Sequence, residues 1–571
     1  MNRKYDFTSV PDRSRDGAAK WTEGTTSEFV PLSVADMEFY TAPEIKTALK
    51  ELAENSILGY TNPTERYFDA VISWQKRRHG FDVKKEWIVT TPGVVDALEL
   101  LTTAVTNANE AVLILTPVYY PFDVSVTAMG RHIVYSELIN KNGVYKIDRE
   151  DFKKKAARKD VTALLLSNPH NPVGKVWTEE ELKFIADVCC ENNVFVIDDE
   201  IHNDLIMPGV KHTVLATLGD EIKNNCAVCT APSKTFNLAG LQCSNIIIPN
   251  KAFRDKMKLA AAINVHFHLN IFAYTACEAA YNKCEDWLLE LLPVIKENAE
   301  LVESFMKENF PEVVCSPLEG TYLQWIDVRG LGFTHEEMRE ILEGEKIFLD
   351  NGEMFGIAGR GFQRINLACA KSTLEKALFR FKRGVERRRE EEKKHGRPIH
   401  ITLENGVIFE GAGDEKCKKL VAFSRPVGSV FSEELFTFLD KIKEKKDSKI
   451  TVFVPSSEEE VENLRALHDY TIIADPDGKI FSKYNCFTCN SGVQLVSGDK
   501  AFYEIADNSS NRPIFDEELL KLVFGMKENM KKRELQLPVF AELDENNRVT
   551  FAYYGKTATD FPKECARGFA V

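Results

Sequence analysis

This 571-residue sequence is informative first for what it lacks. No apolar run approaches the roughly 18 residues that a membrane-spanning helix needs, so we expect no membrane partner. The first residues contain no apolar core of a secretory signal. Basic residues are not in excess, because 87 acidic residues face 73 basic ones and the formal net charge is −14. This balance argues against a nucleic-acid partner.

The 13 cysteines form no regular disulfide framework. In a long chain without a visible signal, such cysteines are typical of reduced thiols, which favours a cytoplasmic location. Two Cys-x-x-Cys pairs occur, Cys226/Cys229 and Cys486/Cys489. The first pair lies in an apolar run that is typical of a buried strand, and the second falls in a different predicted domain. We therefore expect no metal site.

The length exceeds what one hydrophobic core usually holds, so at least two domains are expected. A dense charge run, "RGVERRREEEKKHGRP" at 383–398, ends in Gly and Pro and is typical of a helix end followed by a linker. The predicted domains are therefore 1–395 and 396–571.

Compact apolar runs and helical patterns alternate in the first domain. The runs "VTALLLSNP" at 161–169 and "NVFVIDDE" at 193–200 are typical of strands buried on both faces of a parallel sheet. Between them, Thr178 and Glu181 have the spacing of a helix capping box. This βαβ pattern predicts an α/β domain, in which ligands collect at the carboxyl ends of the strands.

Several residues that follow these strands could serve a ligand. Gly93 precedes a helix that starts near Val94, and such a start can bind an anion. Tyr119 and Tyr120 could stack on a flat ring, and Asn171 could donate a hydrogen bond. Each of these signals also fits ordinary loop architecture when it is taken alone.

Two further strand ends carry charged residues. The segment "DDEIH" includes Asp199, which could keep a cationic ring nitrogen protonated, and His202. Acids in a solvated loop are the alternative interpretation. The segment "APSKTFNLAGL" includes Lys234, which among apolar residues could have a lowered pKa and form a Schiff base.

Together these features are the parts of a pyridoxal 5'-phosphate (PLP) site. The motifs "SNPHNPVG", "DDEIH" and "SKTFNLAGL", in this order, resemble those of the fold-type I PLP enzymes, the class I/II aminotransferase superfamily. "VADMEF", "GYTNP", "TPVYYPF", "MFGIAGRGFQRINLAC" and "STLEKAL" are similar to the cystathionine β-lyase or cysteine-S-conjugate β-lyase branch. The resemblance covers roughly residues 25–385 and implies a large mixed-sheet domain with a small C-terminal subdomain.

The resemblance implies a role for each matching residue. Lys234 would carry PLP as a Schiff base and then remove the substrate Cα proton. Asp199 would pair with the ring nitrogen, Asn171 and His202 would bind the ring 3'-oxygen, and Tyr119 would stack on the ring.

Other matches concern the phosphate and the substrate. The phosphate would be held by the backbone of Gly93, Val94 and Val95 and by the Ser233 hydroxyl. Tyr60 matches a tyrosine that reaches the phosphate of a neighbouring subunit, which implies a homodimer with shared active sites. The substrate would be bound by Arg364, at its α-carboxylate, and by Tyr120.

Two positions depart from the family pattern. Gln242 stands where many aminotransferases have a phosphate-binding arginine, so the phosphate cradle has lost one charge. Ser33 stands where the lyase branch often has tryptophan, which would widen the substrate mouth.

The cofactor allows two outcomes after Cα deprotonation. If the β-carbon carries sulfur, a thiol leaves and pyruvate and ammonia follow, whereas reprotonation at the cofactor gives transamination. The motifs do not separate these outcomes, and similarity to the branch favours a C–S β-lyase acting on cystathionine or a cysteine S-conjugate over an aminotransferase.

In the second domain, "SVFSEELFTFLDKIKEKK" is predicted to be a helix. The segments "VAFSRPVGSVFSEELFTFL", "DPDGKIFSKYN" and "YYGKTATDFP" loosely resemble those of a thioredoxin-fold, peroxiredoxin-like α/β domain. The loop at 428–432 has serines where such a domain would carry a reactive cysteine, so the resemblance implies that the usual peroxidatic site is absent. Cys486 and Cys489 could be a displaced redox pair or two unremarkable thiols. A third function is therefore thiol redox chemistry or partner binding through this domain.

Overall fold

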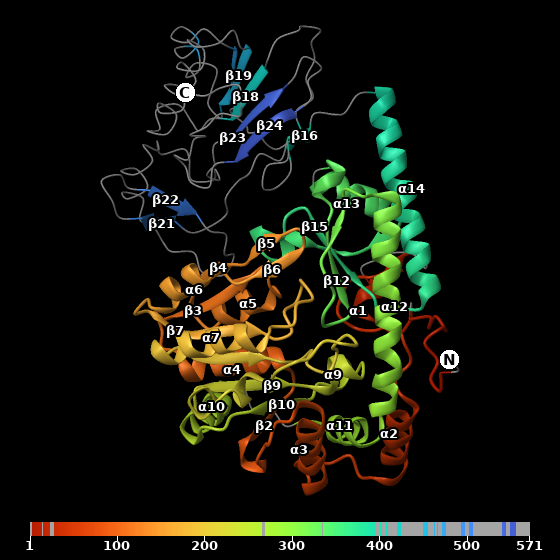
Figure 1. Ribbon diagram of the computed structural model, residues 1–571, viewed down its shortest axis with the longest axis vertical. Helices are drawn as coiled ribbons and strands as arrows, with labels where there is room; N and C mark the ends of the chain where they lie inside the picture. Colours follow the sequence, from red (N-terminus) through yellow and green to blue (C-terminus); the bar gives the residue numbers. More distant parts are fainter. Residues whose placement is uncertain are drawn as a thin grey trace. The chain divides into compact units, whose positions relative to one another are not determined.

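The computed structural model (Figure 1) describes residues 3–395, apart from 14, 23–27, 265–268 and 334. Beyond 395 it describes nine strands, together with Glu462 and Arg465. The chain divides into two compact units, Met1–Phe333 with Met338–Val385, and Thr334–Glu337 with Glu386–Val571. Helix α14 (Lys371–His395) contains most of the charge run. The predicted break near residue 395 stays a prediction.

A seven-stranded mixed sheet forms the centre of the first unit (Figure 1). Its strands, in spatial order, are β2 (Ile88–Thr91), β10 (Ser244–Ile247), β9 (Cys226–Thr230), β8 (Phe195–Asp199), β7 (Val161–Ser167), β3 (Ala111–Thr116) and β4 (His132–Glu137). β10 is antiparallel to both neighbours, and the five strands from β9 to β4 are parallel. The predicted parallel α/β arrangement is confirmed.

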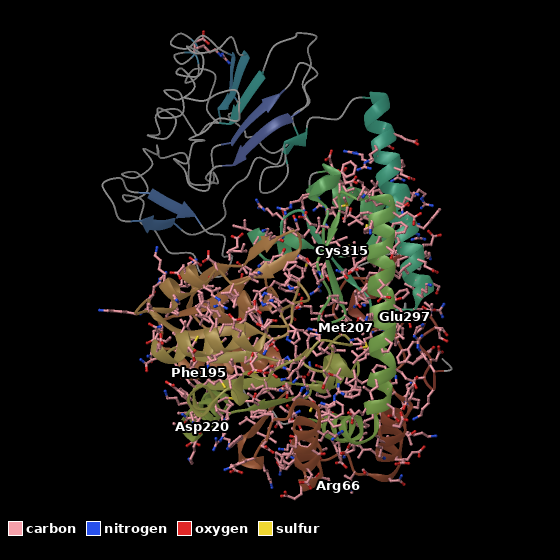
Figure 2. All side chains as sticks on the ribbon, in the orientation of Figure 1. Arg66, Phe195, Met207, Asp220, Glu297 and Cys315 are labelled. Atoms are coloured by element: carbon pink, nitrogen blue, oxygen red, sulfur yellow. The ribbon has the colours of Figure 1, made fainter. Side chains whose placement is uncertain are left out.

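The inner strands β3, β7, β8 and β9 are buried on both faces, which explains why they are largely apolar runs. The edge strand β4 instead alternates between buried and exposed side chains. Leu164 lies in one core cluster and Leu165 in the other, because successive side chains of a strand point to opposite faces. Phe195, which begins β8 (Figure 2), belongs to the same cluster as Leu165. The same alternation separates Cys226 from Cys229, so the two buried free thiols do not form one site.

Helices cover the two faces and connect the strands. The cluster with Leu165 includes α4 (Val94–Val105), α5 (Pro121–Thr127) and α10 (Lys251–Asn264). The opposite cluster includes α6 (Arg149–Ala156), α7 (Glu179–Glu191), α11 (Ile271–Lys283) and parts of α3 (Glu65–His79). The predicted capping box of α7 is confirmed, since Thr178 Oγ1 accepts from the Glu181 N–H at 3.2 Å and Glu181 Oε2 accepts from the Thr178 N–H at 3.0 Å.

A smaller antiparallel sheet completes the first unit. Its order is β11 (Val314–Cys315), β12 (Leu323–Asp327), β15 (Phe362–Asn366) and β14 (Asp350–Asn351). Helix α12 (Glu285–Asn309) packs against β11, whereas α2 (Pro43–Asn55) packs against α11. Helix α13 (His335–Gly344) follows β12 in the chain. A parallel pair of β1 (Val30–Pro31) and β13 (Ile347–Phe348) attaches the N-terminal segment. In that segment, Arg3 pairs at 2.6 Å with Glu297, which lies on α12 (Figure 2).

The second unit contains a five-stranded sheet ordered β20 (Thr471–Ala474), β19 (Lys449–Val454), β18 (Lys419–Phe423), β23 (Val539–Leu543) and β24 (Val549–Tyr554). β18, β19 and β20 are parallel, and β23 is antiparallel to both neighbours. The pairs β16 (His400–Ile401) with β17 (Val407–Ile408) and β21 (Val493–Val496) with β22 (Phe502–Ile505) are also described. The predicted helix, the 428–432 loop and Cys486/Cys489 lie outside the described residues. Among the helices that are described, none is long and apolar enough to span a membrane.

Candidate active site

The predicted site residues gather at one edge of the large sheet, where β7, β8 and β9 end. Asn171 follows β7, Asp199 ends β8, and Lys234 lies in α9 (Pro232–Thr235) directly after β9. β2 runs in the same direction as β9, because each is antiparallel to β10, so Gly93 follows β2 at this edge too. The residues selected by the strand-end argument therefore lie at one edge of the sheet.

Lys234 is a partly buried lysine with an unusual acceptor. Its Nζ donates a hydrogen bond to the Ala35 carbonyl at 2.7 Å. Burial and the nearby Arg364 guanidinium lower the pKa of Lys234 to about 8. The amine is thus a stronger nucleophile near neutral pH than an exposed lysine would be, which is what Schiff-base formation requires.

The acids of "DDEIH" are buried, so the solvated-loop interpretation is wrong. Asp199 is 6% exposed and accepts from the Ile201 N–H at 3.1 Å. Burial raises the pKa of Asp199 to about 7, although the Ile201 bond and the Lys234 charge oppose this. The neighbouring Glu200 is fully buried and paired with His212 at 3.0 Å. A buried carboxylate with a raised pKa is one that lacks a full cationic partner.

His202 is buried beside Lys234. Burial and the Lys234 charge lower the pKa of His202, so its ring is neutral. Among the described residues, none forms a hydrogen bond with its Nδ1. The Tyr322 ring packs edge-on against the His202 ring, and the two ring centroids are 6.0 Å apart. A buried nitrogen without a partner is available to a ligand.

Tyr119 and Tyr120 differ in exposure. The Tyr119 N–H donates to the Asn171 carbonyl at 3.1 Å, and burial together with Tyr120 raises the pKa of the Tyr119 hydroxyl to about 12. The Tyr120 side chain is 44% exposed and lies 5.5 Å from the Tyr119 ring. Tyr119 thus lies in the site, and Tyr120 lies at its solvent side.

Arg364 is almost fully buried and already oriented. Asp350 is its register partner across β14 and β15, and Asp350 Oδ2 accepts from Nε at 3.0 Å and from Nη2 at 2.5 Å. Nη1 donates to Asn171 Oδ1 at 2.9 Å. Three of the five guanidinium N–H groups are engaged in this way, and Asp350 holds the Nε side. The remaining N–H groups on Nη1 and Nη2 suit a carboxylate ligand.

The start of α4 is arranged for an anion. Gly93 is the N-cap residue and provides no side-chain cap, so the first turn keeps its N–H groups for another acceptor. A Cβ at Gly93 would come within 3.0 Å of Asp96 Oδ2. Val94 is buried, and Val95 and Ser233 are half-buried.

Three predicted positions stand apart from this cluster. Tyr60 is fully exposed, in a segment where Ile57 and Leu58 are also exposed. Gln242 is exposed and has a left-handed φ of 53°. Ser33 is only 2% exposed.

Sequence reasoning missed several residues that shape the site: the Ala35 carbonyl, Lys20, Asp36, Tyr322 and Asp350. Ala35 and Asp36 belong to "VADMEF", which was a motif without an assigned chemistry. Among the described residues, no group of three or more His, Cys, Asp or Glu side chains is placed to hold a metal ion.

A family model for aminotransferase class I and II matches residues 27–381. The chain belongs to this family. It is 40% identical over 383 residues to cystathionine beta-lyase PatB of Bacillus subtilis, covering 66% of this chain and 99% of that protein. It is 31% identical over 377 residues to cystathionine beta-lyase of Corynebacterium glutamicum, covering 66% of this chain and 98% of that protein.

Solved structures agree with this placement. The crystal structure of cystalysin from Treponema denticola, which contains a pyridoxal 5'-phosphate cofactor, is 40% identical with a TM-score of 0.66 and covers 67% of this chain and 99% of its own. The crystal structure of the PLP-bound C–S lyase from Staphylococcus hominis is 31% identical with a TM-score of 0.62. The match covers 67% of this chain and 98% of that one. The predicted fold-type I class and the resemblance to the lyase branch are confirmed. The matched family residues end at 381, so the thioredoxin-like domain stays a prediction.

Proposed function

We propose that this chain is a PLP-dependent C–S β-lyase, which cleaves cystathionine or a cysteine S-conjugate to a thiol, pyruvate and ammonia. The observation that carries the proposal is the gathering of Lys234, Asp199, Asn171 and Arg364 at one sheet edge, with the pKa of Lys234 lowered to about 8. The names of the similar proteins support the choice of lyase.

The side chains present fit PLP. Asp199 is a buried carboxylate without a full cationic partner, which suits a protonated ring nitrogen. His202 offers an unpartnered Nδ1 within the described part of the site, and the uncapped turn after Gly93 suits a phosphate. When bound, PLP supplies the electron sink that stabilises negative charge at the substrate Cα.

The chain's own residues then position the substrate and move its proton. The free N–H groups of Arg364 would hold the α-carboxylate, while Asp350 prevents the guanidinium from rotating. Lys234 Nζ would take the Cα proton, because a pKa of about 8 leaves part of the amine neutral near physiological pH. Tyr119 would cover one face of the cofactor, and Tyr120 would border the substrate.

The test is product analysis with the full-length protein and PLP. Incubation with L-cystathionine should release pyruvate and the thiol homocysteine, incubation with L-cysteine should release pyruvate and hydrogen sulfide, and Lys234→Ala should abolish both reactions. Amino-group transfer to a 2-oxo acid, without thiol release, would contradict the lyase and establish the aminotransferase.

We also propose a homodimer with shared active sites. The exposed Ile57, Leu58 and Tyr60 form a small apolar surface of the kind that oligomers bury. Mixing Lys234→Ala and Tyr60→Ala subunits tests this, because half of randomly mixed dimers would be hybrids with one intact site. Activity should recover to about a quarter of wild type after subunit exchange. If the mixed subunits recover no activity, the proposal that the two subunits share their active sites is contradicted.

The cytoplasm is the proposed location, since the nine cysteines described are all free thiols.

The second domain is proposed to be thioredoxin-like. If it has redox activity, the Cys486→Ser/Cys489→Ser double variant should lose thiol-dependent peroxide or disulfide reduction. Equal rates in wild type and the double variant would leave partner binding as its role.

A further inference from the structure

Val34 has a backbone conformation that β-branched residues rarely adopt. Its φ of 46° lies in the left-handed region, which persists only where the surroundings impose it. Asn366, at the end of β15, supplies that constraint. Its Nδ2 donates to the Val34 carbonyl at 2.7 Å and to the Asp36 carbonyl at 2.6 Å. The turn at 34–36 is therefore held in a single strained form.

The strained turn directs one carbonyl group at the site. The Ala35 oxygen accepts from Lys234 Nζ at 2.7 Å and from the Tyr322 hydroxyl at 2.8 Å. Ala35 is 8% exposed, so both bonds lie away from bulk water. The resting position of the Lys234 amine follows from where this turn is held.

A buried charge cluster holds the other side of the turn. Lys20, in the short helix α1 (Ala19–Thr22), is 1% exposed, and its Nζ lies 2.9 Å from both Asp36 Oδ1 and the Asp36 carbonyl oxygen. Arg13 Nη1 contacts Asp36 Oδ2 at 3.1 Å and Glu38 Oε1 at 2.9 Å. Two cations and two anions thus meet beside Ala35.

Such a cluster is a poor means of stabilising a fold. Removing a lysine and its carboxylate partner from water offsets most of the attraction between them, and well-packed apolar side chains would do as well. What buried ion pairs can provide is a defined position for the groups that they bind. Here the bound group is the Asp36 backbone, one peptide unit from the Ala35 carbonyl.

We propose that Lys20 and Asp36 are positioning residues for Lys234, fixing the carbonyl that its amine binds and setting the local electric field at Nζ. The inference rests on the proposed function, in which Lys234 carries the Cα proton. Lys20 and Asp36 act on Lys234 through the turn and through space.

The two residues have opposite effects on Lys234. Burial and Arg364 lower the pKa of Lys234, Asp36 and Asp199 oppose this, and Lys20 adds to the lowering. The other groups that face the amine are His202, a neutral ring, and Tyr322, which shares its acceptor. Removing the Lys20 charge should therefore raise the pKa at this nitrogen, and removing the Asp36 charge should lower it.

The test is a pH titration of the visible absorption band of the full-length protein loaded with PLP. Lys20→Met should shift the midpoint upward by about one pH unit, and Asp36→Asn should shift it downward by a similar amount. Lys20→Arg, which keeps the charge, should titrate like wild type. Lys155→Met is the matched control, because it removes a lysine that pairs with Asp151 on α6 instead.

The outcomes separate this inference from the proposed function. A wild-type protein without any such band would contradict the cofactor assignment itself. A normal wild-type band, with both variants unshifted or shifted in the same direction, would overturn the positioning role alone. If Lys20→Met does not fold, a downward shift in Asp36→Asn together with an unshifted Lys20→Arg supports the inference, and an unshifted Asp36→Asn overturns it.

Discussion

Asp199→Asn should raise the free energy of unfolding of the PLP-free protein and reduce the stabilisation that bound PLP provides. Burial raises the pKa of Asp199 from 3.8 to about 7, so the folded state binds more protons than the unfolded state between these values. Stability is therefore lost as pH rises through this window, and the full penalty is present above pH 7. Asparagine has the same shape and never ionises.

The size of the effect follows from the two pKa values. The difference between 3.8 and about 7 corresponds to a free energy of unfolding about 4 kcal/mol lower at pH 8. The gain of Asp199→Asn over wild type should thus be about 4 kcal/mol at pH 8, about 2 kcal/mol at pH 5 and close to zero below pH 3.8.

Urea unfolding followed by tryptophan fluorescence measures this gain. All six tryptophans lie between Trp21 and Trp325, so the signal reports on the first unit. Asp160→Asn is the control. Arg158 lowers the pKa of Asp160, so removing the Asp160 charge should bring no gain in stability. Added PLP should stabilise wild type more than Asp199→Asn. A gain that does not vary with pH, or a less stable variant at pH 8, would refute the reasoning.

Two further substitutions test the substrate clamp and the N-terminal cap of helix α7. Arg364→Lys should raise KM for the amino acid by about 10- to 100-fold with a smaller change in kcat, because a point charge cannot replace the planar fork that Asn171 helps to hold. Steady-state kinetics would show this, and an unchanged KM would exclude Arg364 from carboxylate binding. Thr178→Ala should lower the free energy of unfolding by about 1 kcal/mol through loss of the capping box with Glu181, as measured by urea unfolding. An unchanged midpoint would mean that the cap contributes nothing.

Local patterns predicted the part of the fold that local chemistry determines. The run that became β7 is apolar on both faces because both faces are covered, and its end marks the edge where the candidate site residues lie. The spacing of Thr178 and Glu181 predicted the start of α7, because both partners of the capping box lie within one helical turn. Strand ends alone placed Asn171, Asp199 and Lys234 together.

The remaining contacts join residues that no local pattern connects. Asp350 holds Arg364 only because β14 and β15 pair in one register, and Lys20 meets Asp36 only after the N-terminal segment folds back. A buried lysine is also contrary to the usual preference of that residue for solvent. Contacts of this kind depend on tertiary packing, which the sequence does not display as a motif.

Borohydride reduction of the PLP-loaded protein, followed by peptide mass spectrometry, tests the central assignment most directly. Reduction converts a Schiff base into a stable secondary amine, so the lysine that holds the cofactor retains its mass. We predict the added mass on the peptide that contains Lys234, and nowhere in Lys234→Ala. The adduct on another lysine, or on none, would contradict the account.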